Sequence, residues 1–238
     1  MNHTEKQGFQ FRQFFVEQSR CAMKVGTDGV LLGAWAKGGD HILDIGTGTG
    51  VVALMMAQRY ADAIVDAIDV DQDAAYQATE NVRHAPFSQR ITVYHAALQN
   101  FRPARPYDSI VCNPPYFLDS LKAPDSSRSL ARHASSDSMT FRDLFGFVKK
   151  HITAEGTLSV IVPVLSLDAL ETEAYLAGFR KTSQVLLKTT PRKPHSRVLV
   201  SFSKTLRGDV TQEQACLMNV DGSRSLWYQR LTEAFYIK

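Results

Sequence analysis

The residues that could most clearly do chemistry begin with a glycine turn at residues 44–50, Asp-Ile-Gly-Thr-Gly-Thr-Gly. Gly46 and Gly48 permit positive φ and carry no Cβ that would hold a ligand away. A helix follows directly, and its first N–H groups are free to bind an anionic or polar group. The spacing is GxGxG, whereas nicotinamide cofactor sites have GxGxxG. Asp44 could hold an ammonium group, so the turn favours a ligand with an amino-acid moiety; a ligand-free strand-to-helix connection is the alternative.

A second candidate is Asp69, which ends the next apolar stretch of the chain. A carboxylate about 20 residues after such a turn accepts hydrogen bonds from ribose hydroxyls in nucleotide-binding α/β proteins. Asp71, two residues later, is expected to cap the following helix. The same capping role is the alternative for Asp69.

The third candidate is the tetrapeptide Asn113-Pro114-Pro115-Tyr116. The prolines stiffen the loop and remove two backbone donors. The Asn113 amide oxygen and the Pro114 carbonyl remain as acceptors, and Tyr116 adds a flat aromatic face. Acceptors beside a stacking plane suit a planar group with an –NH₂, which could be an adenine amino group or a carboxamide. A proline-rich turn that only ends a strand is the alternative.

Each of the three motifs follows a segment with strand character, and helical patterns separate these segments. Alternation of this kind indicates βαβ units and a doubly wound, Rossmann-like, mostly parallel sheet of seven strands in an α/β fold. Ligands of such sheets bind beyond the carboxyl ends of the strands, where all three motifs lie. Strands are expected at residues 41–45, 63–68, 91–95, 109–112, 157–162, 185–187 and 198–202, and helices at residues 51–59, 71–84, 140–150 and 167–177.

Two segments fall outside this alternation. Residues 9–25 are rich in aromatic side chains and could form a hairpin lying over the sheet. Residues 118–139 are rich in Ser, Asp and Arg and show no periodicity. A loop of that length is typically a lid, a binding loop or disordered.

Composition narrows the class of protein. The chain has 238 residues, of which 44% are apolar and 21% charged, as in ordinary globular domains and unlike disordered, collagen-like or coiled-coil chains. Its apolar runs are far shorter than the roughly 20 residues that a membrane span needs. The three cysteines form no CxxC, and the histidines show no metal-ligand spacing, so we expect no disulfide framework, no metal and a cytoplasmic location.

Charge is distributed unevenly along the chain. Residues 1–118 hold 10 basic and 12 acidic side chains, whereas residues 119–238 hold 17 and 12. Residues 180–207 include eight basic side chains and no acidic one. A one-sided basic stretch is typical of a polyanion-binding surface, and a solvated basic face is the alternative.

Taken together, the three motifs resemble the class I S-adenosylmethionine (SAM) methyltransferases of the branch with an NPPY motif. That branch methylates exocyclic amino groups of adenine or the side-chain amide of glutamine. Residues 20–35 (RCAMKVGTDGVLLGAW), residues 188–204 and the ending LTEAFY at residues 231–236 also resemble the bacterial tRNA1(Val) adenine-37 N6-methyltransferases. The resemblance covers nearly the whole chain.

The resemblance implies a single SAM-dependent methyltransferase domain over residues 1–238, in which residues 1–40 extend over the SAM site and residues 41–238 form the core. It implies a tRNA anticodon stem-loop as substrate and S-adenosylhomocysteine as product, with no membrane and no obligate protein partner. The implied SAM-binding residues are Lys24, Thr27, Asp44, Gly46, Thr47, Gly48, Gly50, Asp69, Val70, Ala97, Leu98 and Asn113. The implied catalytic residues are Asn113, Pro114 and Tyr116, and those expected to bind RNA are Phe117, Arg132, His133, Arg192 and Lys193.

The sequence departs from the family at Ala97. Many relatives carry an acid there that contacts the adenine amino group of SAM. Recognition of that adenine would therefore depend on the Leu98 backbone and on apolar contact.

Three other functions are consistent with parts of the sequence. A glutamine N5-methyltransferase acting on a protein such as a release factor needs the same acceptors, but its relatives carry a longer helical N-terminal domain. A ribosomal RNA amino-group methyltransferase is not separated by these motifs. An RNA-binding module without catalysis is disfavoured because Asp44, Gly46, Asp69 and Asn113 are all present.

Overall fold

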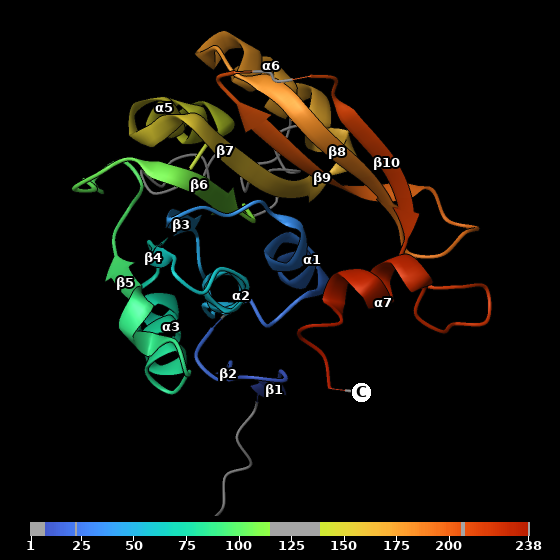
Figure 1. The fold of residues 1–238 in the computed structure, drawn as a ribbon, viewed down its shortest axis with the longest axis horizontal. Coiled ribbons are helices and arrows are strands. Elements are labelled where there is room, and N and C mark those ends of the chain that lie inside the picture. The colour runs from blue at the N-terminus through green and yellow to red at the C-terminus, as the bar shows by residue number, and fades with distance from the viewer. Residues whose placement is uncertain (1–7, 22, 115–138, 206–207, 238) are drawn as a thin grey trace, which may run out of the picture.

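A large mixed sheet organises the molecule in the computed structural model, which describes residues 8–21, 23–114, 139–205 and 208–237 (Figure 1). The strands are β1 (Gly8–Gln10), β2 (Phe15–Glu17), β3 (His41–Ile45), β4 (Ile64–Asp69), β5 (Ile91–His95), β6 (Tyr107–Cys112), β7 (Ile152–Pro163), β8 (Arg180–Lys188), β9 (His195–Ser203) and β10 (Thr211–Cys216). The helices are α1 (Thr27–Trp35), α2 (Val51–Arg59), α3 (Gln72–Arg83), α5 (Phe141–His151), α6 (Leu167–Ala177) and α7 (Leu226–Thr232), with short 3₁₀ turns η1 (Ser88–Arg90) and η3 (Val164–Ser166).

Within the described ranges the main sheet has eight strands in the order β10-β8-β9-β7-β6-β3-β4-β5. All neighbours are parallel except β9, which runs antiparallel to both β7 and β8. The doubly wound α/β fold expected from the sequence is therefore confirmed. The sheet has one strand more than the seven expected, because β10 adds to the edge beside β8.

Side chains that alternate across the strands build two apolar cores, one on each face. On β3, Ile42 joins the core beneath α1, α2, α3 and α7, whereas Leu43 joins the core beneath α5 and α6. Both side chains are fully buried. The arrangement is the three-layer sandwich seen in Figure 1.

The N-terminal hairpin predicted within residues 9–25 is present but shorter, because only β1 and β2 pair. It packs outside the helices and not directly on the sheet, as Figure 1 shows below α2. Phe14 contacts Phe87 edge-on at 6.0 Å, and Phe11 stacks on Tyr236 at 6.1 Å. After Glu17, the last residue of β2, the chain leaves the hairpin and runs along α3.

The helix caps agree with the sequence pattern. Asp71 accepts hydrogen bonds from the N–H groups of Asp73 and Ala74, which confirms its predicted capping role. Thr140 and Asp143 form a capping box that starts α5. No helix in the part of the chain that the structure describes is long and apolar enough to cross a membrane.

Candidate active site at the carboxyl edge of the sheet

The strand register places the three sequence motifs side by side. Ile45, the last residue of β3, pairs with Ile68 on β4 and with Cys112 on β6. Neighbouring strands lie about 4.8 Å apart. The glycine turn, Asp69 and Asn113 therefore leave three adjacent strands at the same level, with the glycine turn in the middle.

Backbone hydrogen bonds fold the glycine turn back over β4. The N–H groups of Gly46 and Thr47 both donate to the carbonyl of Ile68, at 2.9 and 3.0 Å. Gly46 and Gly48 have φ of +70° and +55°, in the left-handed region that glycine favours. Among the residues that the structure describes, no atom beyond the adjacent residues lies within 4 Å of a Cβ built on either glycine. Space is therefore open in front of the turn, as a bound ligand requires.

Asp44 is buried behind this turn with only 1% of its surface exposed. Its Oδ2 accepts hydrogen bonds from the Thr47 hydroxyl at 2.6 Å and from the Ala53 N–H at 3.1 Å. Burial nevertheless raises the pKa of the carboxyl group to about 7, and the nearby Asp69 charge raises it further. A cation placed beside Asp44 would reverse this shift.

Asp69 holds the backbone of the glycine turn and of the residues after β4. Its Oδ2 accepts the Gly48 N–H at 2.7 Å, and its Oδ1 accepts the Asp71 N–H at 2.9 Å. Burial raises its pKa in spite of these two bonds. Since each carboxylate oxygen can accept more than one hydrogen bond, the carboxylate retains capacity for ligand hydroxyls.

The residues after β5 close one side of this edge. The Ala96 N–H donates to the carbonyl of Asp69 at 2.9 Å and joins the two strand ends. Leu98 is buried in the core, whereas Ala97 is half-buried and its carbonyl accepts turn hydrogen bonds. Val70 is 45% exposed. An apolar edge of this kind fits a flat heterocycle better than it fits a charged group.

Asn113 is half-buried and Pro114 is buried, directly after β6. Cys112, the residue before them, is fully buried, and its thiol pKa is raised by burial and by the Asp44 and Asp69 charges. Those two acids therefore lie near the residue that precedes Asn113. Tyr116, Phe117, Arg132 and His133 lie outside the described residues, so their predicted roles stay predictions.

The start of α1 lies against the start of α2, immediately after the glycine turn. A Cβ on Gly29 would come within 3.3 Å of Val51. Asp28 is bound to Arg197 of β9 at 2.8 Å, an ion pair that joins α1 to the far half of the sheet. Sequence reasoning did not anticipate this ion pair. Lys24 and Thr27 are exposed, and their predicted contact with the cofactor stays a prediction.

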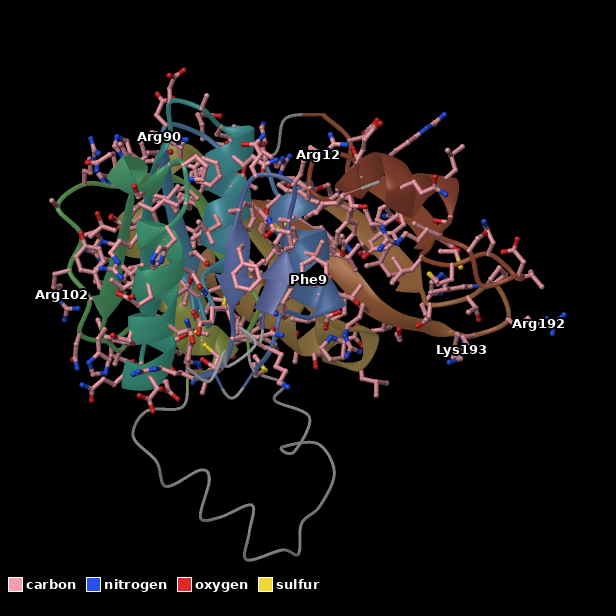
Figure 2. The ribbon with its side chains drawn as sticks, turned by 90° about the horizontal axis from the view of Figure 1, so that it is seen from below. Phe9, Arg12, Arg90, Arg102, Arg192 and Lys193 are labelled. Atoms are coloured by element: carbon pink, nitrogen blue, oxygen red, sulfur yellow. The ribbon has the colours of Figure 1, made fainter. Side chains whose placement is uncertain are left out.

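Arg192 and Lys193 lie in the turn between β8 and β9. Because β8 runs parallel to β7 and β6, this turn is at the same edge of the sheet as Asn113. Both side chains are exposed, and Figure 2 shows them at the extremity of the β8–β9 hairpin. Their predicted contact with RNA stays a prediction.

The donor set and the open turn fit SAM. A buried carboxylate behind the turn suits the ammonium group, a carboxylate at the end of β4 suits the ribose, and Leu98 suits the adenine. Among residues 8–21, 23–114, 139–205 and 208–237, no group of three or more His, Cys, Asp or Glu side chains could hold a metal ion.

Comparison with known proteins defines the class. Residues 20–162 match the family described as "Methyltransferase small domain". Among solved structures, a predicted O-methyltransferase of Agrobacterium tumefaciens has a TM-score of 0.68 at 21% identity, and covers 87% of this chain and 96% of its own. A methyltransferase of Pyrococcus furiosus has a TM-score of 0.54 at 19% identity, and covers 74% and 81%. These structures share the fold.

Curated relatives define the family within this class. The tRNA1(Val) (adenine(37)-N6)-methyltransferase of Bacteroides fragilis is 43% identical over 97% of this chain and 98% of its own. The protein of the same name from Parabacteroides distasonis is 41% identical over 97% and 98%. The chain belongs to the tRNA1(Val) (adenine(37)-N6)-methyltransferase family. The protein is therefore a SAM-dependent methyltransferase, as predicted from the sequence.

Proposed function

We propose that the protein transfers a methyl group from SAM to the N6 amino nitrogen of an adenine in tRNA, at position 37 of tRNA1(Val). The curated relatives carry this activity in their names. The observation that carries the proposal is the register that aligns the exits of β3, β4 and β6. It brings a cofactor turn and an acceptor-rich Asn-Pro corner to neighbouring positions.

SAM supplies the methyl group from a positively charged sulfonium. The residues that would hold SAM are Asp44 at its ammonium group, Asp69 at its ribose and Leu98 at its adenine. Gly46 and Gly48 would lie along its methionine part. These contacts orient the donor.

The acceptors of the Asn-Pro corner act on the target amine. Its nitrogen lone pair is delocalised into the purine ring, which makes it a weak nucleophile. Hydrogen bonds from the –NH₂ to the Asn113 amide oxygen and the Pro114 carbonyl favour a pyramidal nitrogen with a localised pair. Positive charge develops on this nitrogen during transfer, so both acceptors bind the transition state more strongly than the ground state. Tyr116 stacks on the base and Phe117 extends that surface.

Orientation supplies most of the acceleration, since alignment of two reactants can contribute about 7–11 kcal/mol. The target adenine must leave its stack to enter the edge. An unpaired anticodon-loop base is inexpensive to extrude. Arg132, His133, Arg192 and Lys193 hold the phosphates around it, and the proton released from the product nitrogen passes to water.

The direct test uses SAM with a labelled methyl group and total RNA from cells that lack the enzyme, followed by mapping of the modified nucleoside. We expect label in N6-methyladenosine at position 37 of tRNA1(Val). Label in ribosomal RNA alone, or in a glutamine of added release factor and not in RNA, would replace the proposal by the corresponding alternative.

A variant separates the catalytic role of Asn113 from cofactor binding. Asn113→Ala removes one acceptor for the amine, and we expect the single-turnover rate to fall about 100-fold or more while SAM still binds, as for the loss of one transition-state hydrogen bond. Calorimetry with SAM and a single-turnover assay measure the two quantities. Lost SAM binding with an unchanged rate at saturation would contradict the assignment.

A further inference from the structure

Two buried amide side chains on α3 bind a segment from the N-terminal region. Gln77 and Asn81 are each 3% exposed and lie four residues apart, so they share one face of the helix. Residues 17–21 run along this face, toward the start of α3. Buried amides are costly unless they are hydrogen-bonded, and both are bound to this segment.

Asn81 joins three parts of the chain. Its Oδ1 accepts the Glu17 N–H at 2.9 Å, and its Nδ2 donates to the Glu17 carbonyl at 2.8 Å. This pair imitates the bonds between two β-strands. The same Nδ2 donates to the carbonyl of Thr49, in the glycine turn, at 2.8 Å. One side chain therefore fixes the segment and the cofactor turn together.

Gln77 holds the next part of the segment one helical turn closer to the site. Its Oε1 accepts the Arg20 N–H at 3.2 Å and the Ser19 hydroxyl at 3.5 Å. The Arg20 guanidinium lies 4.6 Å from the centre of the Tyr76 ring and supports the same placement. Residues at the two ends of the segment are thus bound to side chains on successive turns of α3.

The segment ends beside the turn that carries Asp69. Cys21 is buried, and its thiol pKa is raised to about 11 by burial and by the charges of Asp69, Asp71 and Asp73. Earlier in the segment, Gln18 accepts the Val25 N–H at 2.8 Å and ties it to the residues before α1. Because Asn81 binds both Glu17 and the Thr49 carbonyl of the glycine turn, and the segment then runs toward the start of α3, residues 17–21 border the cofactor site from the α3 side.

We propose that Asn81 and Gln77 are positioning residues for the cofactor site: they hold residues 17–21 along α3 so that this segment encloses the ribose side beside Asp69, while Asn81 fixes the glycine turn at Thr49. The inference rests on the proposed function in that SAM is the cofactor. Directional amide bonds fit this role better than apolar contacts, since a shift of the segment by one residue would break them all. The KM for SAM depends on both residues, whereas methyl transfer at saturating SAM does not.

Two variants of nearly unchanged shape test the proposal. Asn81→Asp turns a carboxylate toward the carbonyls of Glu17 and Thr49, and we expect the dissociation constant and the KM for SAM to rise about tenfold. Gln77→Met leaves the Arg20 N–H without its acceptor, and we expect a rise of about threefold or more. For both, kcat at saturating SAM and the KM for tRNA should stay within about twofold of the wild type. Thr79→Ala is the control, because the exposed Thr79 hydroxyl donates to the carbonyl of Ala75 within its own helix and not to residues 17–21.

Amide hydrogen exchange supplies a second readout that needs no activity. In the wild type, SAM should slow exchange at the N–H groups of Glu17 and Arg20. Gln77→Met should speed exchange at Arg20, whose N–H loses its acceptor. Asn81→Asp should speed exchange at Glu17, because repulsion between the new carboxylate and the Glu17 carbonyl loosens this pair although the N–H keeps an acceptor. The proposal would be overturned if the folded variants bound SAM with unchanged affinity. It would also be overturned if SAM did not change the exchange rates of these two amides in the wild type. If the wild type binds no SAM in calorimetry, the proposed function itself fails; if it binds SAM and the variants bind equally, only this inference fails.

Discussion

At the scale of single residues, Asp44 shows the strongest conflict between burial and charge at the site. Its carboxyl pKa rises from 3.8 to about 7, because two hydrogen bonds do not replace the lost hydration. The folded state therefore binds a proton more tightly than the unfolded state does. Stability is greatest below the unfolded pKa and falls as pH rises from about 4 to about 7.

Asp44→Asn should remove this dependence. The amide oxygen can still accept from Thr47 and Ala53, but no buried charge forms. We expect the variant to gain stability relative to the wild type between pH 5 and pH 8 in urea unfolding. SAM binding should show the opposite, because the ionised carboxylate holds the ammonium group. Wild-type affinity should rise from pH 6 to pH 7.5 and that of the variant should be weak and flat; parallel pH curves for the two proteins would refute the role.

Both its backbone conformation and a close neighbour require a glycine at position 50. It has φ of +81° at the start of α2, and an added Cβ would lie 3.3 Å from the Cβ of Ala78. We expect Gly50→Ala to lower the free energy of unfolding by about 1–3 kcal/mol. Gly146→Ala is the matched control, since a Cβ on Gly146 inside α5 would meet none of the described atoms outside its own helix backbone within 4 Å, and it should raise the free energy of unfolding by about 0.5–1 kcal/mol. Chemical denaturation measures both, and equal effects would contradict the argument.

Local sequence was sufficient for the residues that end strands. Glycines after 41–45, an acid after 63–68 and prolines after 109–112 each mark a chain reversal by their own conformational preferences. The ion pair of Asp28 and Arg197 could not be predicted in this way, since its partners are 169 residues apart in the chain. It exists because β9 reverses direction and returns its first residues to the edge where α1 begins.

At the scale of elements, the missed segments share a lack of periodic pattern. Helix α1 is apolar on nearly every side and contains two glycines, so it has no polar face to reveal a helical period. Strand β10 reads TQEQAC and is mostly exposed, so it shows no apolar alternation. The formation of both elements depends on tertiary contacts. Burial against α2 and α7 fixes α1, and pairing with β8 fixes β10.

Two arginines cap helix ends at the amino edge of the sheet, opposite the candidate site. Arg59 donates to the carbonyls of Gly33 and Ala36 at the end of α1. Arg90 donates to the carbonyls of Ala57, Tyr60 and Ala63 at and beyond the end of α2. A cation at a helix C-terminus satisfies carbonyls that have no partner within the helix.

Arg90→Met should therefore destabilise the fold beyond the loss of a surface charge. Three carbonyl acceptors lose a charged donor, and we expect the free energy of unfolding to fall by about 2–3 kcal/mol. Arg83→Met removes an exposed arginine paired with Glu80 in the same helix, and should cost less than about 0.5 kcal/mol. Urea unfolding at constant pH compares the two variants. A cost for Arg90→Met as small as that for Arg83→Met would show that water satisfies these carbonyls equally well.

At the scale of the whole molecule, the antiparallel direction of β9 brings part of the basic stretch to the carboxyl edge of the sheet. The net charge is only +3, too small to hold a polyanion by itself. Of the eight basic side chains within residues 180–207, the seven that the structure describes belong to β8, β9, the turn between them and the residue after β9. The β8–β9 turn lies at the carboxyl edge of the sheet. In Figure 2, Arg192 and Lys193 lie at the opposite end of the molecule from Arg102.

Salt dependence of tRNA binding distinguishes local phosphate contacts from overall charge. Each phosphate contact adds about 0.7–0.9 to the slope of log affinity against log salt, so Arg192→Ala/Lys193→Ala should flatten this slope by about 1–2. The double variant Arg12→Ala/Arg102→Ala removes the same charge from the hairpin and from the loop after β5, both distant from the β8–β9 turn, and should change the slope by less than about 0.5. A filter-binding titration from low to physiological salt measures both. If the two double variants flatten the slope equally, net charge alone attracts the RNA; if neither does, the β8–β9 turn is not part of the RNA-binding surface.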